Sequence, residues 1–61
     1  MNFMEITEIV KKARTSVGES QARFAKRFGF SQALISQWER GDKIPLYHNM
    51  VDFLKIIVEN T

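Results

Sequence analysis

Five side chains in the middle of the chain are spaced so that they would share one face of a helix, where the polar ones could donate and accept hydrogen bonds. They are polar or small, and at about 100° per residue they fall within an arc of roughly 140°: Gln32, Ala33, Ser36, Gln37 and Arg40. A glutamine amide can bond adenine N6 and N7 together, and a methyl group can pack against that of thymine. The alternative is a polar helix face that only meets solvent.

The residues around this face carry the signals of two short helices joined by a tight turn. Ser20 and Ser31 are good N-caps, while Gly29 and Gly41 are placed to end the helices that follow them. Two short helices with a glycine-centred turn define a helix-turn-helix. This unit would hold the polar face on its second helix.

Apolar side chains at helical spacing continue through the rest of the chain. Pro45 is a natural first residue for a last helix. We expect an all-α fold in a single domain, residues 1–61, with four helices, or five if the last segment breaks. The predicted helices cover about residues 4–17, 21–28, 32–40 and 46–58.

The stretch from Ser20 to Gly41, with Pro45 beyond it, resembles the Cro/CI (lambda-repressor-like, XRE) helix-turn-helix regulators. The shared pattern is Ser/Asn-Gln, apolar-Ala, apolar-Gly, Ser/Thr-Gln, Ile, and a closing Glu-x-Gly followed by Pro. The resemblance covers about residues 6–55. It implies a DNA-binding domain whose second motif helix enters the major groove. The family's usual break between a fourth and a fifth helix is missing, which leaves the mode of dimerisation open.

The polar face of residues 32–40 and the resemblance to the Cro/CI family together indicate which residues would contact DNA. The expected base-reading residues are Gln32, Ala33, Ser36 and Gln37. The expected phosphate contacts are Gln21, Ser31, Arg40 and Lys43.

The resemblance also pairs Arg14 with Glu39, as an ion pair that fixes the reading helix to the first helix. The alternative is two exposed charges that contribute about 0–1 kcal/mol.

The charge is distributed unevenly along the chain. Residues 11–43 hold eight basic side chains against three acidic ones, whereas both flanks carry net negative charge. A basic middle segment suits a nucleic-acid partner. Solvated helix faces are the simpler explanation for most of the remaining cations, which are Lys11, Lys12, Arg23, Lys26 and Arg27.

Other chemistries lack the residues they need. His48 is the single histidine and there is no cysteine, so we expect no metal site and no triad with the serines. The three glycines are isolated, which excludes a phosphate-cradling loop. We therefore expect no enzyme, no cofactor and no small-molecule ligand. The chain shows no signal peptide or membrane segment, so the expected location is the cytoplasm of a bacterial or phage-infected cell, in association with the nucleoid.

The last predicted helix is apolar over roughly 220° of its circumference, more than a surface helix needs to face its own core. If Leu46, Met50 and Leu54 point toward the core, further apolar side chains remain on the other flank of the helix. We expect these side chains to form a homodimer interface: Phe53, Ile56 and Ile57. The alternative is that the first helix covers this flank through Phe3 and Ile6.

These features predict a sequence-specific transcriptional regulator of double-stranded DNA, a repressor similar to the Cro-like phage or prophage regulators. A homodimer would set its reading helices about 34–36 Å apart on a near-palindromic operator. The alternative function is an antitoxin or anti-repressor module that covers a protein partner with the wide apolar surface of the last helix. Salt dependence of duplex binding separates the two.

Overall fold

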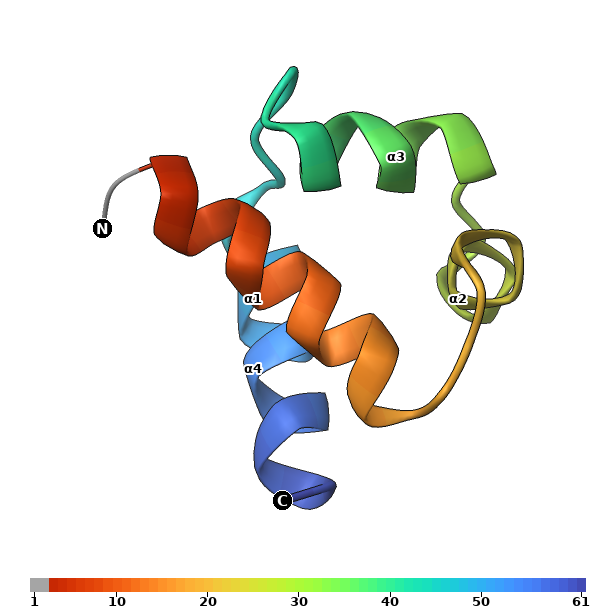
Figure 1. The fold of residues 1–61 in the computed structure, drawn as a ribbon, viewed down its shortest axis with the longest axis vertical. Helices are drawn as coiled ribbons and strands as arrows, with labels where there is room; N and C mark the ends of the chain where they lie inside the picture. The colour runs from red at the N-terminus through yellow and green to blue at the C-terminus, as the bar shows by residue number, and fades with distance from the viewer. Residues whose placement is uncertain (1–2) are drawn as a thin grey trace.

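The computed structural model describes residues 3–61, with side chains from residue 5 onward. Four helices occur there and no strand, which confirms the all-α class: α1 (Phe3–Ser16), α2 (Gln21–Phe28), α3 (Gln32–Arg40) and α4 (Tyr47–Glu59) (Figure 1). The motif helices α2 and α3 have the predicted bounds, while α1 and α4 are each displaced by one residue. Over residues 3–61, no helix combines the length and the apolar character that crossing a membrane requires.

The ends of α2 and α3 explain why these helices are short. Ser20 Oγ accepts a hydrogen bond from the Arg23 N–H at 3.2 Å, and Ser31 Oγ accepts one from the Leu34 N–H at 3.1 Å. Gly29 and Gly41 end the two helices in the left-handed conformation, with φ of 76° and 82°. A side chain disfavours that conformation, so glycine is the residue that permits both stops.

The start of α4 differs from the prediction. Leu46 is its N-cap, with φ −66° and ψ 155°, and the helix begins at Tyr47. Pro45 is buried and precedes the cap, so it is not the first helical residue. The backbone at Leu46 is still extended, because an N-cap residue precedes the first residue with helical dihedral angles.

The core joins all four helices around aromatic rings. Phe53 of α4 lies 5.7 Å from Phe24, 5.4 Å from Phe28 and 5.9 Å from Trp38, measured between ring centroids. Such edge-to-face and tilted pairs are favourable beyond the area they bury. α1 contributes side chains that are fully buried, Val10 and Ala13.

The predicted exposure of the Phe53 flank is wrong. Phe53 is fully buried, and Ile56 and Ile57 are partly buried against the core. Ile6 and Ile9 of α1 pack on this core, as the alternative expected; the Phe3 side chain lies outside the described residues.

The opposite flank, predicted to face inward, is divided: Met50 is buried, as predicted, whereas Leu46 and Leu54 are exposed. Leu46 is 65% exposed and Leu54 is 41% exposed. The apolar arc of α4 is wide enough for either half to enter the core. The half that meets the rings of α2 and α3 is the half that is buried.

Candidate nucleic-acid interface

The outer face of α3 presents polar side chains along its whole length. Gln32, Ala33 and Arg40 are exposed, whereas Ser36 and Gln37 are half-buried. All five line one open hollow on the surface. On the opposite side of the helix, Ile35 and Trp38 are buried in the core. The division of α3 into an apolar inner side and a polar outer side is therefore the one that its spacing indicates.

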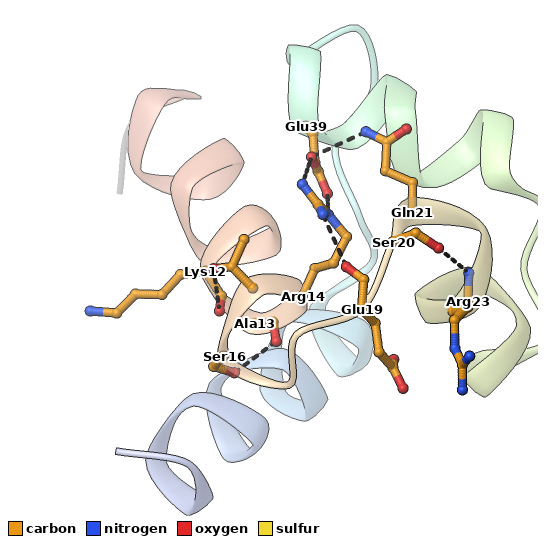
Figure 2. Close-up of polar contacts among 10 residues, drawn as sticks. Lys12, Ala13, Arg14, Ser16, Glu19, Ser20, Gln21, Arg23 and Glu39 are labelled. Carbon is orange, nitrogen blue, oxygen red and sulfur yellow. Dashed lines mark hydrogen bonds and ion pairs between the residues drawn. The ribbon is translucent and has the colours of Figure 1, made fainter.

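A polar network joins this helix to the two helices before it (Figure 2). Arg14 of α1 donates two hydrogen bonds to Glu39 of α3, from Nε to Oε2 at 2.7 Å and from Nη2 to Oε1 at 3.1 Å. Arg14 Nη1 also donates to the Glu19 carbonyl oxygen at 3.0 Å. The Gln21 amide of α2 donates to Glu39 Oε1 at 3.2 Å. One carboxylate thus receives donors from both α1 and α2.

Burial makes this network an effective clamp. The Glu39 side chain is 5% exposed and that of Arg14 is 20% exposed. The hydrogen bond to Glu39 raises the pKa of Arg14 above its already high ordinary value, so the guanidinium stays charged. A two-pronged arginine–carboxylate bond fixes orientation as well as distance. The outer face of α3 is consequently held at a fixed angle to α1 and α2.

The comparison with known families decides what this arrangement is. The Helix-turn-helix family model matches residues 10–57, which is most of the chain and includes both motif helices and the clamp. The chain belongs to the Cro/CI-like (XRE) helix-turn-helix family. It is therefore a DNA-binding helix-turn-helix regulator. No curated protein and no solved structure matches the chain.

The residues expected to contact phosphate in this helix-turn-helix domain lie around the outer face of α3. Gln21 and Ser31 stand at the N-termini of α2 and α3, where backbone N–H groups favour an anion. Ser31 Oγ already accepts the Leu34 N–H, so its hydroxyl proton is what it can offer a phosphate. Lys43 is exposed in the loop after α3.

Arg40 lies differently from the other expected phosphate contacts. Its Nε donates to Asp42 Oδ2 at 3.0 Å, and its Nη1 donates to Ser36 Oγ. These bonds hold the guanidinium against the hollow of α3, beside the expected base-reading side chains. In this helix-turn-helix domain, Arg40 thus contacts both Ser36 on the outer face of α3 and the acidic side chain of Asp42.

Two hydrogen bonds in the helix-turn-helix were not predicted from the sequence: the one from Arg40 to Asp42 and the one from Gln21 to Glu39. Asp42 was counted only as a charge, and the bond from Gln21 to Glu39 was not foreseen. The spacing of Arg40 and Asp42, two residues apart across a glycine, is a usable signal for the first. The second had no local signal, because Gln21 and Glu39 are 18 positions apart.

Proposed function

We propose that this protein is a sequence-specific transcriptional repressor that binds double-stranded DNA as a homodimer on a near-palindromic operator. In this proposal α3 lies in the major groove, and its base contacts are Gln32, Ala33, Ser36 and Gln37. The repressor occludes a promoter by occupying it.

The observation that carries the proposal is the outer face of α3. Its side chains line an open hollow on the surface, the apolar half of the same helix is buried, and the clamp from Arg14 through Glu39 holds its angle. A mobile helix would lose entropy on docking, whereas a clamped one has little left to lose.

Phosphate contacts would position this face on the duplex. Gln21, Ser31 and Lys43 lie at helix ends or in the loop beside it. Contacts of this kind set register and orientation without selecting sequence. One reading helix spans only a few base pairs, so a second copy would be needed for a long operator.

The experiment that tests the proposal is selection of bound duplexes from a random DNA pool, followed by titration of the selected sequence at several salt concentrations. We expect a near-palindromic site with two half-sites one helical turn apart. The logarithm of affinity should fall linearly with the logarithm of salt concentration, by about 0.9 for each phosphate neutralised. Failure to enrich any sequence would contradict the base-reading role of α3.

A protein-binding module is the second candidate, favoured by the exposed apolar side chains on α4, of which Tyr47 is 85% and Val58 is 72% exposed. Such a module would bind a different protein tightly with DNA dispensable. Its binding would also survive substitution of Gln32 and Gln37, since these lie on another helix.

A further inference from the structure

Arg40 occupies the middle of the outer face of α3 and not its edge. The five side chains that line the hollow span an arc of about 140° at 100° per residue, and Arg40 lies near the centre of that arc, between Ser36 and Ala33. A helix in the major groove directs the middle of its outer face toward the base pairs and its edges toward the two backbones. α3 ends at Arg40, whereas helices of this motif dock by their N-terminal residues. A long side chain is therefore needed to reach the bases from this position.

The turn after α3 holds an acid against this arginine. Gly41 adopts the left-handed conformation, and the chain turns back so that the Asp42 N–H donates to the Gln37 carbonyl oxygen at 2.9 Å. From there Asp42 Oδ2 accepts a hydrogen bond from Arg40 Nε at 3.0 Å, while Ser36 Oγ accepts one from Arg40 Nη1. The guanidinium thus has one partner in the turn and one on the helix, although the Arg40 side chain is 60% exposed.

We propose that Arg40 reads a guanine, and that Asp42 and Ser36 position its guanidinium for that contact. A guanidinium has five N–H donors, of which these partners use one on Nε and one on Nη1. Three donors remain, one on Nη1 and two on Nη2, so the two terminal nitrogens can still offer a fork to two acceptors. Guanine presents such a pair, O6 and N7, in the major groove, and arginine is well matched to it.

Charge distinguishes a guanine contact from a phosphate contact. The Asp42 carboxylate is 57% exposed and neutralises the charge of Arg40. A phosphate bound to this guanidinium would lie close to that carboxylate and would be repelled by it. Guanine O6 and N7 are neutral acceptors, so the carboxylate does not oppose them. Among the side chains that the structure describes, no acid pairs with Lys43, whose charge therefore suits a phosphate better.

The fork selects guanine over adenine. Adenine keeps the N7 acceptor but carries an N6 amino donor where guanine carries O6. One N–H of the Arg40 fork would then face another donor and lose its partner. This inference rests on the proposed function and deepens it, because it names one base of each half-site of the operator.

The test is selection of duplexes from a random DNA pool with the wild-type chain and with two variants at Arg40. Arg40→Gln should lose the preference at one guanine of each half-site and keep it elsewhere. Arg40→Lys keeps the charge but not the fork, so it should lose the same preference with an unchanged salt slope. Each variant should lower the ratio of affinities for guanine over adenine at that position by about five- to one-hundred-fold.

A base analogue tests the fork itself. 7-Deazaguanine carries a C–H group in place of N7. At the position that Arg40 reads, it should weaken binding of the wild-type chain by about tenfold, since one hydrogen bond to a charged group is lost. The affinity of Arg40→Gln should be unchanged by the same analogue.

The positioning role of Asp42 is measured with Asp42→Asn. This variant should raise the affinity for random duplexes more than the affinity for the operator, because it removes a negative charge and also loosens the guanidinium. The ratio for guanine over adenine should therefore fall several-fold, at the position that Arg40 reads and at no other.

Matched controls separate these effects from a general change of charge. Lys43→Gln removes the same charge as Arg40→Gln, and it should weaken binding to all duplexes alike. Asp52→Asn removes the same charge as Asp42→Asn from an exposed position on α4, and it should leave base preference unchanged. Circular dichroism should show that every variant keeps the fold, since all the substituted side chains are exposed.

Three results would overturn the inference. They are wild-type base preferences at every position in Arg40→Gln, equal effects of 7-deazaguanine on that variant and on the wild-type chain, and an Asp42→Asn variant that keeps its preference as fully as Asp52→Asn. In each case an operator enriched by the wild-type chain would leave the proposed function intact. A wild-type chain that enriches no sequence would contradict both.

Discussion

Arg14 and Glu39 are 25 positions apart in the sequence, yet they share two hydrogen bonds of 2.7 and 3.1 Å. The carboxylate is almost fully buried at 5% exposure. Its charge is therefore costly to leave unpaired, and the clamp stabilises the fold only when both partners are present.

The first prediction is that these two residues are energetically coupled. Arg14→Ala and Glu39→Ala should each lower the free energy of unfolding by about 1–3 kcal/mol, because each removes charged hydrogen bonds. The double variant should cost less than the sum of the two. Urea melts of the four proteins measure the coupling. The control is the exposed pair of Arg40 and Asp42, whose coupling should be about 0–1 kcal/mol. Equal coupling in both pairs would contradict a clamp that depends on burial.

The second prediction concerns base reading by α3. Gln32→Ala or Gln37→Ala should leave the melting behaviour unchanged, since both side chains lie on the outer face. Each should cost about 1–3 kcal/mol in discrimination at one base position. Competition between the selected operator and its single-base variants measures the effect. Unchanged sequence preference in both variants would remove these residues from the reading role.

The third prediction is that two neighbours in the loop after α3 act in opposite directions. Lys43→Ala should weaken binding to all duplexes and flatten the salt slope by about one unit. Asp42→Asn should strengthen binding, because it removes a negative charge beside the proposed DNA-binding face and replaces the ion pair with Arg40 by a weaker bond to a neutral amide. Both affinities are measured on specific and random duplexes at several salt concentrations. A shift in sequence preference for Lys43→Ala would assign that residue to base reading.

The fourth prediction concerns the titration of Glu19. Hydrogen bonds from Arg27 lower the pKa of this carboxyl below its ordinary value. Charged Glu19 is thus favoured in the folded protein, and the pair contributes stability above the ordinary pKa. That contribution is lost as pH falls through the lowered folded-state pKa. Carboxyl resonances should show the Glu19 pKa moving back toward its ordinary value in Arg27→Gln. An unmoved pKa would show that this pair does not persist in solution.

The fifth prediction compares two apolar residues of α4. Phe53→Ala should lower the free energy of unfolding by about 3–5 kcal/mol, because it leaves a cavity among three rings. Val58→Ala should change it by no more than about 0.5 kcal/mol. Urea denaturation at low protein concentration gives both values. A small effect at Phe53 would mean that α4 packs by its other flank.

Much of the fold could be predicted from local residue patterns. Ser20 and Ser31 cap the helices they precede, and Gly29 and Gly41 end them, because capping and left-handed turns depend on a few adjacent residues. The outer face of α3 was also predictable. Its polar and apolar residues fall on opposite sides of a helix, so only one orientation buries the apolar half.

α4 is the element for which the sequence was insufficient. Phe53 was expected outside and Leu54 inside, and the structure places them the other way round. The apolar arc of this helix is about twice as wide as the core requires, so its periodicity does not distinguish the two halves. What decides is the space left between α1, α2 and α3, which a phenylalanine ring fills beside Phe24 and Trp38. Helical spacing and capping are local and can be seen in the sequence, whereas close packing of side chains from distant segments exists only in the tertiary structure.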